Sequence, residues 1–255
     1  MKKADLWLIA PLIVCAALTI VFGVPGIITY NDKTLGKLIC EIVPRLAVSV
    51  FLIILMFARG YAAPLKVKWK VRHLIWCIPC FMVALANFPY TALAFGKASI
   101  DRTDLIWLFI IKCLSIALLE EMFFRAIMVP LFLERFKENK YCLLITVIGT
   151  SVLFALIHLL NIFLGAGVGY TMLQVGYTFL IGCMLAVILI YTKNIWLCII
   201  VHFVFDIGGA IIKDLGSGGY KAQDLTFWIL TAVAGVICAA HIIVTLIRLM
   251  KNKNT

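Results

Sequence analysis

Two adjacent glutamates and an arginine lie near the middle of an apolar run from Leu105 to Leu133. They are Glu120, Glu121 and Arg125. The run is long enough to cross a bilayer as a helix. An unpaired charge at the membrane centre costs about 2.5–3.5 kcal/mol on insertion scales. The three groups must therefore face an internal cavity, neutralise one another, or take part in chemistry.

The spacing of these residues separates the two glutamates. Glu121 and Arg125 are four residues apart, so on a helix they share a face and can pair. Glu120 points about 100° away, because a helix has about 3.6 residues per turn. Two close carboxyl groups in a low dielectric do not both ionise at low cost. A carboxylate that takes up a proton can act as a general base on water. The alternative is a purely structural role, in which Glu121 and Arg125 form a buried ion pair that stabilises helix packing.

Two further apolar runs carry polar residues at helical spacing. Phe154 and His158 are one turn apart, and Asn161 follows on nearly the same face. His202 and Asp206 are also four residues apart on one face. No serine or cysteine stands beside a histidine in a way that indicates a covalent nucleophile. The set therefore favours water activated by a carboxylate.

Composition excludes an ordinary soluble protein. The 255 residues are 64% hydrophobic and only 14% charged, against about 45–50% and about 25% in soluble domains. The net charge of +11 comes from basic residues that punctuate apolar runs, which indicates contact with membrane lipids rather than nucleic acid. Nine cysteines are scattered through the apolar runs. We interpret them as buried packing residues and not as a disulfide framework.

The apolar runs predict an all-α polytopic membrane protein with about eight transmembrane helices. Helices four to seven are expected to enclose a polar cavity. We expect one membrane domain, 1–255, with a catalytic core at about 105–212, N-terminal spans within 6–96 and a C-terminal span at 225–249. Pro79 and Pro89 are expected to kink the third span, and Pro130 the end of the fourth. The predicted spans are Leu6–Ile28, Leu38–Ala58, Leu74–Gly96, Leu105–Leu133, Tyr141–Leu164, Tyr170–Tyr191, Ile195–Ile212 and Leu225–Leu249.

The distribution of Lys and Arg predicts the orientation. Fourteen of them fall in the termini and loops of one side and six on the other, with three inside spans. The richer side is expected to be cytoplasmic, which places both termini of a multi-pass cell-membrane protein in the cytoplasm. The segment Arg59–Arg72 alternates cations with apolar residues and is interpreted as an interfacial strip on that side.

The three polar segments carry a family resemblance. Glu-Glu-Met-Phe-Phe-Arg at 120–125, Phe154-x3-His158 and His202-x3-Asp206 resemble the three motifs of the CAAX protease and bacteriocin-processing family. The similarity extends from about Leu118 to Ile207. It implies an intramembrane glutamate endopeptidase of about eight helices.

The resemblance also implies roles for the residues. Glu120 with His158 would activate the attacking water, and His202 with Asp206 would stabilise the oxyanion. Glu121 and Arg125 would hold the geometry of the site. The eukaryotic prenyl-protein proteases of this kind carry Asn where this chain has Asp206. An ionised Asp206 would repel an oxyanion, so it must be protonated or must orient His202.

The expected partners are a peptide or small-protein substrate and membrane lipids, with no nucleic acid and no cofactor. The Asp206 form of the motif and the short loops favour bacteriocin or signal-peptide processing, or self-immunity, over prenyl-protein maturation. A zinc-dependent protease with Glu120, Glu121, His158 and His202 as ligands is one alternative. An ion-coupled transporter and a non-catalytic membrane scaffold or immunity factor are the others.

The remaining ionisable residues receive structural interpretations. Glu41 and Arg45 are spaced to form a helical ion pair. Lys112 is expected to snorkel to the interface from the outer end of its helix. His73 and His241 lie near the predicted cytoplasmic boundary, where we expect them to meet headgroups or water.

Overall fold

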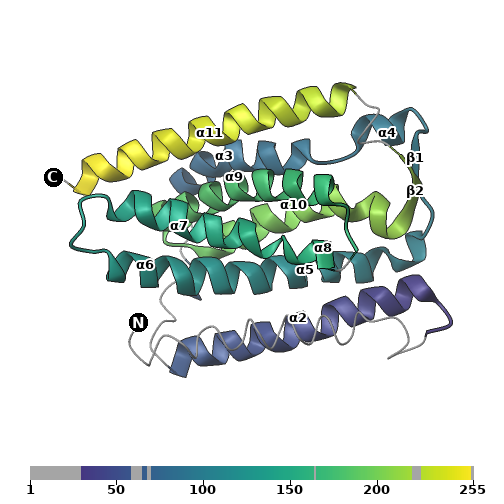
Figure 1. The fold of residues 1–255 in the computed structure, drawn as a ribbon, viewed down its shortest axis with the longest axis horizontal. Coiled ribbons are helices and arrows are strands. Elements are labelled where there is room, and N and C mark those ends of the chain that lie inside the picture. Colours follow the sequence, from purple (N-terminus) through teal and green to yellow (C-terminus); the bar gives the residue numbers. More distant parts are fainter. Residues whose placement is uncertain (1–29, 59–64, 68–69, 164, 220–224, 254–255) are drawn as a thin grey trace.

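The computed structural model describes residues 30–58, 65–67, 70–163, 165–219 and 225–253. The first predicted span, Leu6–Ile28, lies outside these residues. The long helices lie side by side along one axis (Figure 1). In chain order the elements are α2 (Lys33–Ala58), α3 (Val71–Ala86), α4 (Tyr90–Ala94), β1 (Ala98–Ile100), η3 (Thr103–Leu105), α5 (Ile106–Glu121), η4 (Met122–Met128), α6 (Val129–Arg135), α7 (Cys142–Ile157), α8 (Leu160–Phe163), α9 (Val168–Thr192), α10 (Ile195–Leu215), β2 (Gly216–Gly218) and α11 (Leu225–Lys253).

The all-α membrane architecture is confirmed. Within the described residues, five helical segments are long and apolar enough to cross a membrane, and α3 is a shorter apolar helix. Their outer faces expose large apolar side chains such as Phe57 and Val236, which are 66% and 70% exposed. Such faces suit contact with lipid. The five segments are Lys33–Ala58, Cys142–Phe163, Val168–Thr192, Ile195–Leu215 and Leu225–Lys251.

The fourth predicted span is helical throughout but changes its hydrogen-bond pattern. α5 passes directly into the π-helical segment η4, and α6 follows without a break. Pro130 lies at the start of α6. Because proline has no N–H, the regular bonding of a helix is interrupted just before it. A π-helical turn is rare and is frequent at functional sites; here it follows Glu121 directly and contains Arg125.

The third predicted span, Leu74–Gly96, is interrupted next to Pro89, where a kink was predicted, and so is not one continuous helix. α3 contains Pro79 and ends at Ala86, and α4 starts after Pro89. The break packs against α10: the Asn87 side chain donates to the Phe205 carbonyl oxygen over 2.8 Å. A Cβ on Gly208 would lie 2.9 Å from the Phe88 backbone nitrogen, so this close approach requires glycine.

Two short strands, absent from the sequence prediction, fix the C-terminal end of α10. β1 and β2 pair antiparallel, with Ala98 opposite Gly218 and Ile100 opposite Gly216. Gly218 has a φ of +98°, a conformation that glycine adopts without a steric penalty. The Asp101 and Arg102 amides donate to the carbonyl oxygen of Leu215. The end of α10 is thereby tied to the segment that leads into α5.

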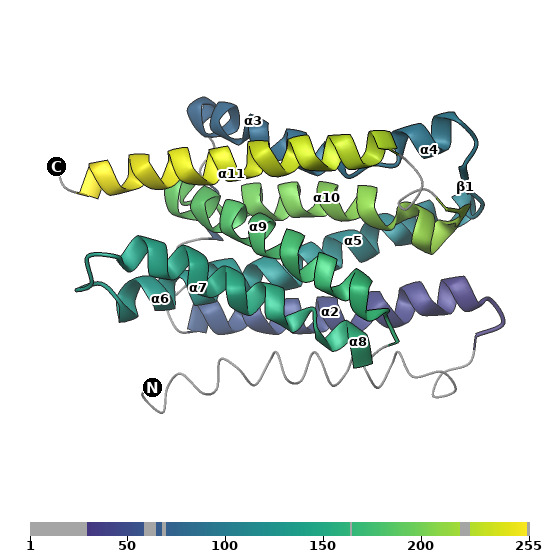
Figure 2. The ribbon, with the colours of Figure 1, turned by 45° about the horizontal axis from the view of Figure 1, so that its top comes forward.

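The interior lies around α9 and α10, and α10 packs against α5, α3 and α9 (Figure 2). The residues of α9 from Ile181 to Ile190 are all buried, as expected for a helix segment that is apolar on every face. Leu185, Ile188, Ile195 and Leu197 are at most 1% exposed. The half of α10 that bears His202 and Asp206 is therefore held by packed neighbours on several sides.

Candidate active site

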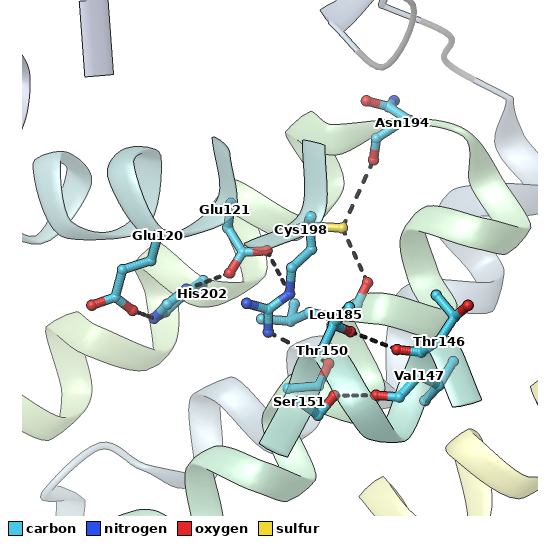
Figure 3. A network of polar contacts seen from close by, with 12 residues as sticks. Glu120, Glu121, Thr146, Val147, Thr150, Ser151, Leu185, Asn194, Cys198 and His202 are labelled. Atoms are coloured by element: carbon cyan, nitrogen blue, oxygen red, sulfur yellow. Dashed lines mark hydrogen bonds and ion pairs between the residues drawn. The ribbon is translucent and has the colours of Figure 1, made fainter. Parts of the chain in front are cut away.

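The polar residues singled out from the sequence come from three parts of the helix bundle. Glu120 and Glu121 end α5, His158 caps the C-terminus of α7, and His202 and Asp206 occupy the middle of α10. Figure 3 shows both glutamate side chains directed toward His202. Residues that are 82 positions apart in the chain therefore meet at one imidazole.

His202 lies at the centre of the site, with carboxylates on both sides of its ring. Its Nδ1 is 2.8 Å from Glu121 Oε1, so Nδ1–H donates to that carboxylate. Its Nε2 is 3.6 Å from Glu120 Oε2 and 3.6 Å from Asp206 Oδ1. The Glu121 side chain is fully buried, whereas those of Glu120 and Asp206 are 26% and 20% exposed. The Nε2 side of the ring is the side open to a substrate or water.

Glu121 and Arg125 form the helical ion pair that their spacing predicted. Arg125 Nε is 3.2 Å from Glu121 Oε2, and both side chains are at most 2% exposed. The Arg125 guanidinium lies 4.3 Å from the centre of the Phe154 ring and donates a long 3.4 Å bond to the Gly182 carbonyl oxygen. Arg125 therefore joins the end of α5 to α7 and α9. The stacking of Arg125 on Phe154 was not predicted from the sequence.

His158 lies beside the same aromatic ring. Its Nδ1 is 2.9 Å from the Phe154 carbonyl oxygen, and since a carbonyl only accepts, Nδ1–H is the donor. The neutral ring then carries its lone pair on Nε2. The Phe154 ring centre is 5.2 Å from that of His158 and 6.0 Å from that of His202. In the described part of the chain no hydrogen bond or ion pair joins His158 to Glu120.

Asn161 has a different position from the carboxylates. Its side-chain amide donates to the Gln174 side-chain oxygen over 2.9 Å, which links α8 to α9. Asn161 is one turn from His158 along the chain, but its contact points toward α9. The structure thus brings together Glu120, Glu121, His202 and Asp206 directly. Arg125 joins them through Glu121 and His158 lies beside them across the Phe154 ring, whereas the described contacts of Asn161 lead away to α9.

The donor set does not match a zinc site. Among the described residues, no group of three or more His, Cys, Asp or Glu side chains is arranged to hold a metal ion. Glu121 lies at Nδ1 of His202 and Glu120 at Nε2. These two carboxylates therefore face opposite edges of one ring. A single tetrahedral ion, with ligand distances of about 2.0–2.3 Å, does not reach both while bound to that imidazole.

A second set of buried charges lies farther along the same helices, and it overturns the expectation for Lys112. Lys112 is 6% exposed and does not snorkel. It contacts Asp214, and its Nζ is 3.3 Å from Glu41 Oε2. Lys37 also pairs with Asp214 at 2.7 Å, and the predicted pair of Glu41 and Arg45 is present at 3.6 Å. The network joins α2, α5 and α10.

The expectation for His73 and His241 is also wrong, since both are buried, at 5% and 7% exposure. His241 Nε2–H donates to the Trp76 carbonyl oxygen over 3.1 Å, and the ring lies 3.7 Å from Cys80 Sγ. The His73 ring packs against the edge of Tyr191 at 5.8 Å between centres. Neither histidine meets solvent as the sequence alone had indicated.

Residues 102–208 match the family described as Type II CAAX prenyl endopeptidase Rce1-like. This part of the chain is therefore similar to the Rce1-like family. The matched segment contains all three motifs and every site residue named above, so the resemblance drawn from those motifs is confirmed. No curated protein and no solved structure matches the chain. Together with the apolar helices, the family identifies a membrane protease in general terms.

Proposed function

We propose that this Rce1-like protein is a metal-independent glutamate endopeptidase that cleaves a peptide bond in a small peptide or protein. The observation that carries the proposal is the arrangement around His202. One buried glutamate holds Nδ1, and a second, partly exposed glutamate lies at Nε2. Peptide hydrolysis needs an activated nucleophile and a donor for the developing negative charge. This arrangement offers both within one cluster.

Glu120 is suited to be the general base. Its side chain is 26% exposed and lies 3.6 Å from His202, whereas Glu121 is enclosed and already pairs with Arg125 and His202. Glu120 takes a proton from water while the water oxygen attacks the scissile carbonyl carbon. The same proton then passes to the leaving nitrogen as the C–N bond breaks. The lone pair on His158 Nε2 accepts the second hydrogen of that water.

His202 is suited to stabilise the oxyanion. The hydrogen bond to Glu121 orients the ring, as a carboxylate does for a catalytic histidine. When Nε2 carries a proton, its N–H donates to the oxygen of the tetrahedral intermediate. Asp206 lies one helical turn away at 3.6 Å from Nε2. We assign Asp206 the role of holding His202 in the protonated form. The positive charge of His202 then offsets the repulsion between an ionised Asp206 and the oxyanion.

The substrate reaches the site from the cytoplasmic side or laterally from lipid. We propose a cell-membrane location with both termini cytoplasmic, as the Lys and Arg distribution predicts. Bacteriocin processing, signal-peptide processing and self-immunity remain our preferred uses of the activity over prenyl-protein maturation, because Asp206 replaces the Asn of the prenyl-protein proteases.

The proposal is tested by comparing the membrane peptidome of cells that express the wild-type protein or Glu120→Ala. We expect peptide products that depend on Glu120, at equal protein abundance. The matched control is Glu134→Ala, which removes an exposed glutamate of α6 and is expected to leave the peptidome unchanged. Identical peptidomes for the wild type and Glu120→Ala would support the scaffold alternative.

A further inference from the structure

A cluster of aromatic and cationic side chains lies far from the candidate active site, where α3 begins and α9 and α11 end. Arg248 of α11 is exposed, and its guanidinium lies 4.8 Å from the centre of the Trp76 ring and 5.8 Å from that of Tyr191. We call these three residues the aromatic–cation cluster. A guanidinium over two aromatic faces is a cation–π arrangement. The guanidinium thus lies beside two aromatic rings and is still exposed, so its N–H groups remain available to a ligand.

The aromatic part of the cluster is held rigidly before any ligand arrives. The Trp76 indole N–H donates to Thr245 Oγ1 over 3.1 Å. The Trp76 carbonyl oxygen accepts from His241 over 3.1 Å, and the Trp76 ring lies 5.3 Å from that of Tyr191. Both the indole N–H and the backbone carbonyl of Trp76 bond to residues of α11. The ring is therefore already ordered, and little conformational entropy is lost when a ligand binds.

The surroundings of the cluster are strongly positive. Lys66 and Lys70 are exposed before α3, and Arg72 is exposed in its first turn. The Leu65 carbonyl oxygen accepts from the Trp196 indole over 3.1 Å, which holds Leu65 against α10. Segments 65–76, 188–196 and 241–251 contain no Asp or Glu. The positive charge at this end of α3 and α11 is therefore not balanced by carboxylates of these segments.

A buried nitrogen in the same place lacks a partner. His73 follows Arg72 directly and packs edge-on against Tyr191. His73 is only 5% exposed, and its Nδ1 makes no hydrogen bond within the described structure. A buried polar atom without a partner is costly and calls for a ligand or water. An anion beside the cluster would offset the excess of cations, and it would accept from His73 Nδ1 where that nitrogen carries the proton and a water or a phosphate oxygen reaches it.

Apolar side chains border the cluster on the outer surface of both helices. On α3, Leu74 and Ile75 are 41% and 60% exposed, and on α11 Val244 and Ile247 are 51% and 49% exposed. A ligand that is anionic at one end and apolar at the other fits this combination. A free anion would use only the cationic part of it.

We propose that the aromatic–cation cluster binds the phosphate of an anionic phospholipid headgroup, with the acyl chains along the exposed apolar residues of α3 and α11. Arg presents several N–H groups in a fixed plane and therefore pairs well with phosphate oxygens. Lys70 and Arg72 add attraction from the neighbouring segment. This site is separate from the proposed peptidase chemistry and stands without it.

The experiment measures lipid retention by the purified full-length chain in detergent, using native mass spectrometry with added phosphatidylglycerol. We expect phosphatidylglycerol to bind more tightly than phosphatidylcholine. Arg248→Gln should weaken retention of phosphatidylglycerol about five-fold, since one Lys or Arg near an anionic membrane surface is worth about 1 kcal/mol. Trp76→Phe keeps an aromatic face and should retain phosphatidylglycerol about as tightly as the wild type. Trp76→Leu should bind phosphatidylglycerol weakly.

The matched control is Arg135→Gln, which removes an exposed cation at the end of α6 on the same predicted side of the membrane. Its phosphatidylglycerol binding should equal that of the wild type. Equal losses in Arg248→Gln and Arg135→Gln would overturn the proposal, because binding would then depend on net charge alone. Displacement of the lipid by an equal concentration of inorganic phosphate would also overturn it and assign the site to a free phosphate.

Discussion

Lys112→Met gives the sharpest test of how the buried charges position α5 against α10. Lys112 contacts Asp214, whose side chain is 1% exposed, and lies 3.3 Å from Glu41, which is 23% exposed. Removing one partner of a buried ion pair costs about 3–5 kcal/mol, because the other charge stays buried without compensation. Here Lys37 still pairs with Asp214 and Arg45 with Glu41. The loss should therefore fall at the low end, about 3 kcal/mol.

The assay is thermal unfolding of the purified protein in detergent, with the double variant as control. A cost of about 3 kcal/mol corresponds to a fall in Tm of roughly 6–12 °C for a chain of this size. Lys112→Met combined with Asp214→Asn removes both buried charges and should recover more than half of that fall. A fall below about 2 °C in the single variant, or no recovery in the double variant, would refute the reasoning.

Three other predictions concern the helix cap at Asp32, the buried ion pair of Arg125 and the independence of cleavage from metal. Asp32 precedes α2, accepts from the Thr34 and Leu35 amides, and pairs with Arg102; the bond from Arg102 lowers the pKa of Asp32 to about 2. Its stabilising contribution should be complete above pH 4 and lost as pH falls through about 2. Asp32→Ala should therefore lower Tm at neutral pH, with Asp32→Asn between it and the wild type because Asn still caps the helix. Arg125→Ala should destabilise the fold by about 3–5 kcal/mol, since it leaves Glu121 buried without its cation, and thermal unfolding measures this. Peptide cleavage should survive strong chelation of divalent metals, and activity lost to chelation and restored by zinc would contradict the metal-independent proposal.

The local part of the site could be predicted from the sequence. Glu121 and Arg125 pair because four residues along a helix return a side chain to the same face, and His202 approaches Asp206 for the same reason. The meeting of these groups at one place was inferred from the cost of isolated charges in lipid and from the family resemblance. These inferences need only the spacing of residues within one helix and the general cost of burying charge in lipid. Both can be assessed from a single sequence.

Contacts between distant segments could not be predicted in this way. Lys112 is buried because Asp214, 102 residues away, lies against it, and the spacing of either residue alone does not reveal the other. The β1–β2 pair joins two segments of three residues that are too short to have a recognisable strand pattern. The stacking of Arg125 on Phe154 depends on how η4 packs against α7. The π-helical turn at Met122–Met128 also depends on Pro130 in its packed context.

The most direct test of the proposed chemistry is the cleavage rate of Glu120→Gln on a peptide substrate found by the peptidome comparison. Gln keeps the shape of Glu120 but cannot take a proton from water. We expect kcat to fall by about 10²–10⁴, the usual contribution of a general base, with an unchanged Tm and with Glu134→Gln as active as the wild type. A kcat for Glu120→Gln equal to that of the wild type would contradict the assignment of Glu120 as the base.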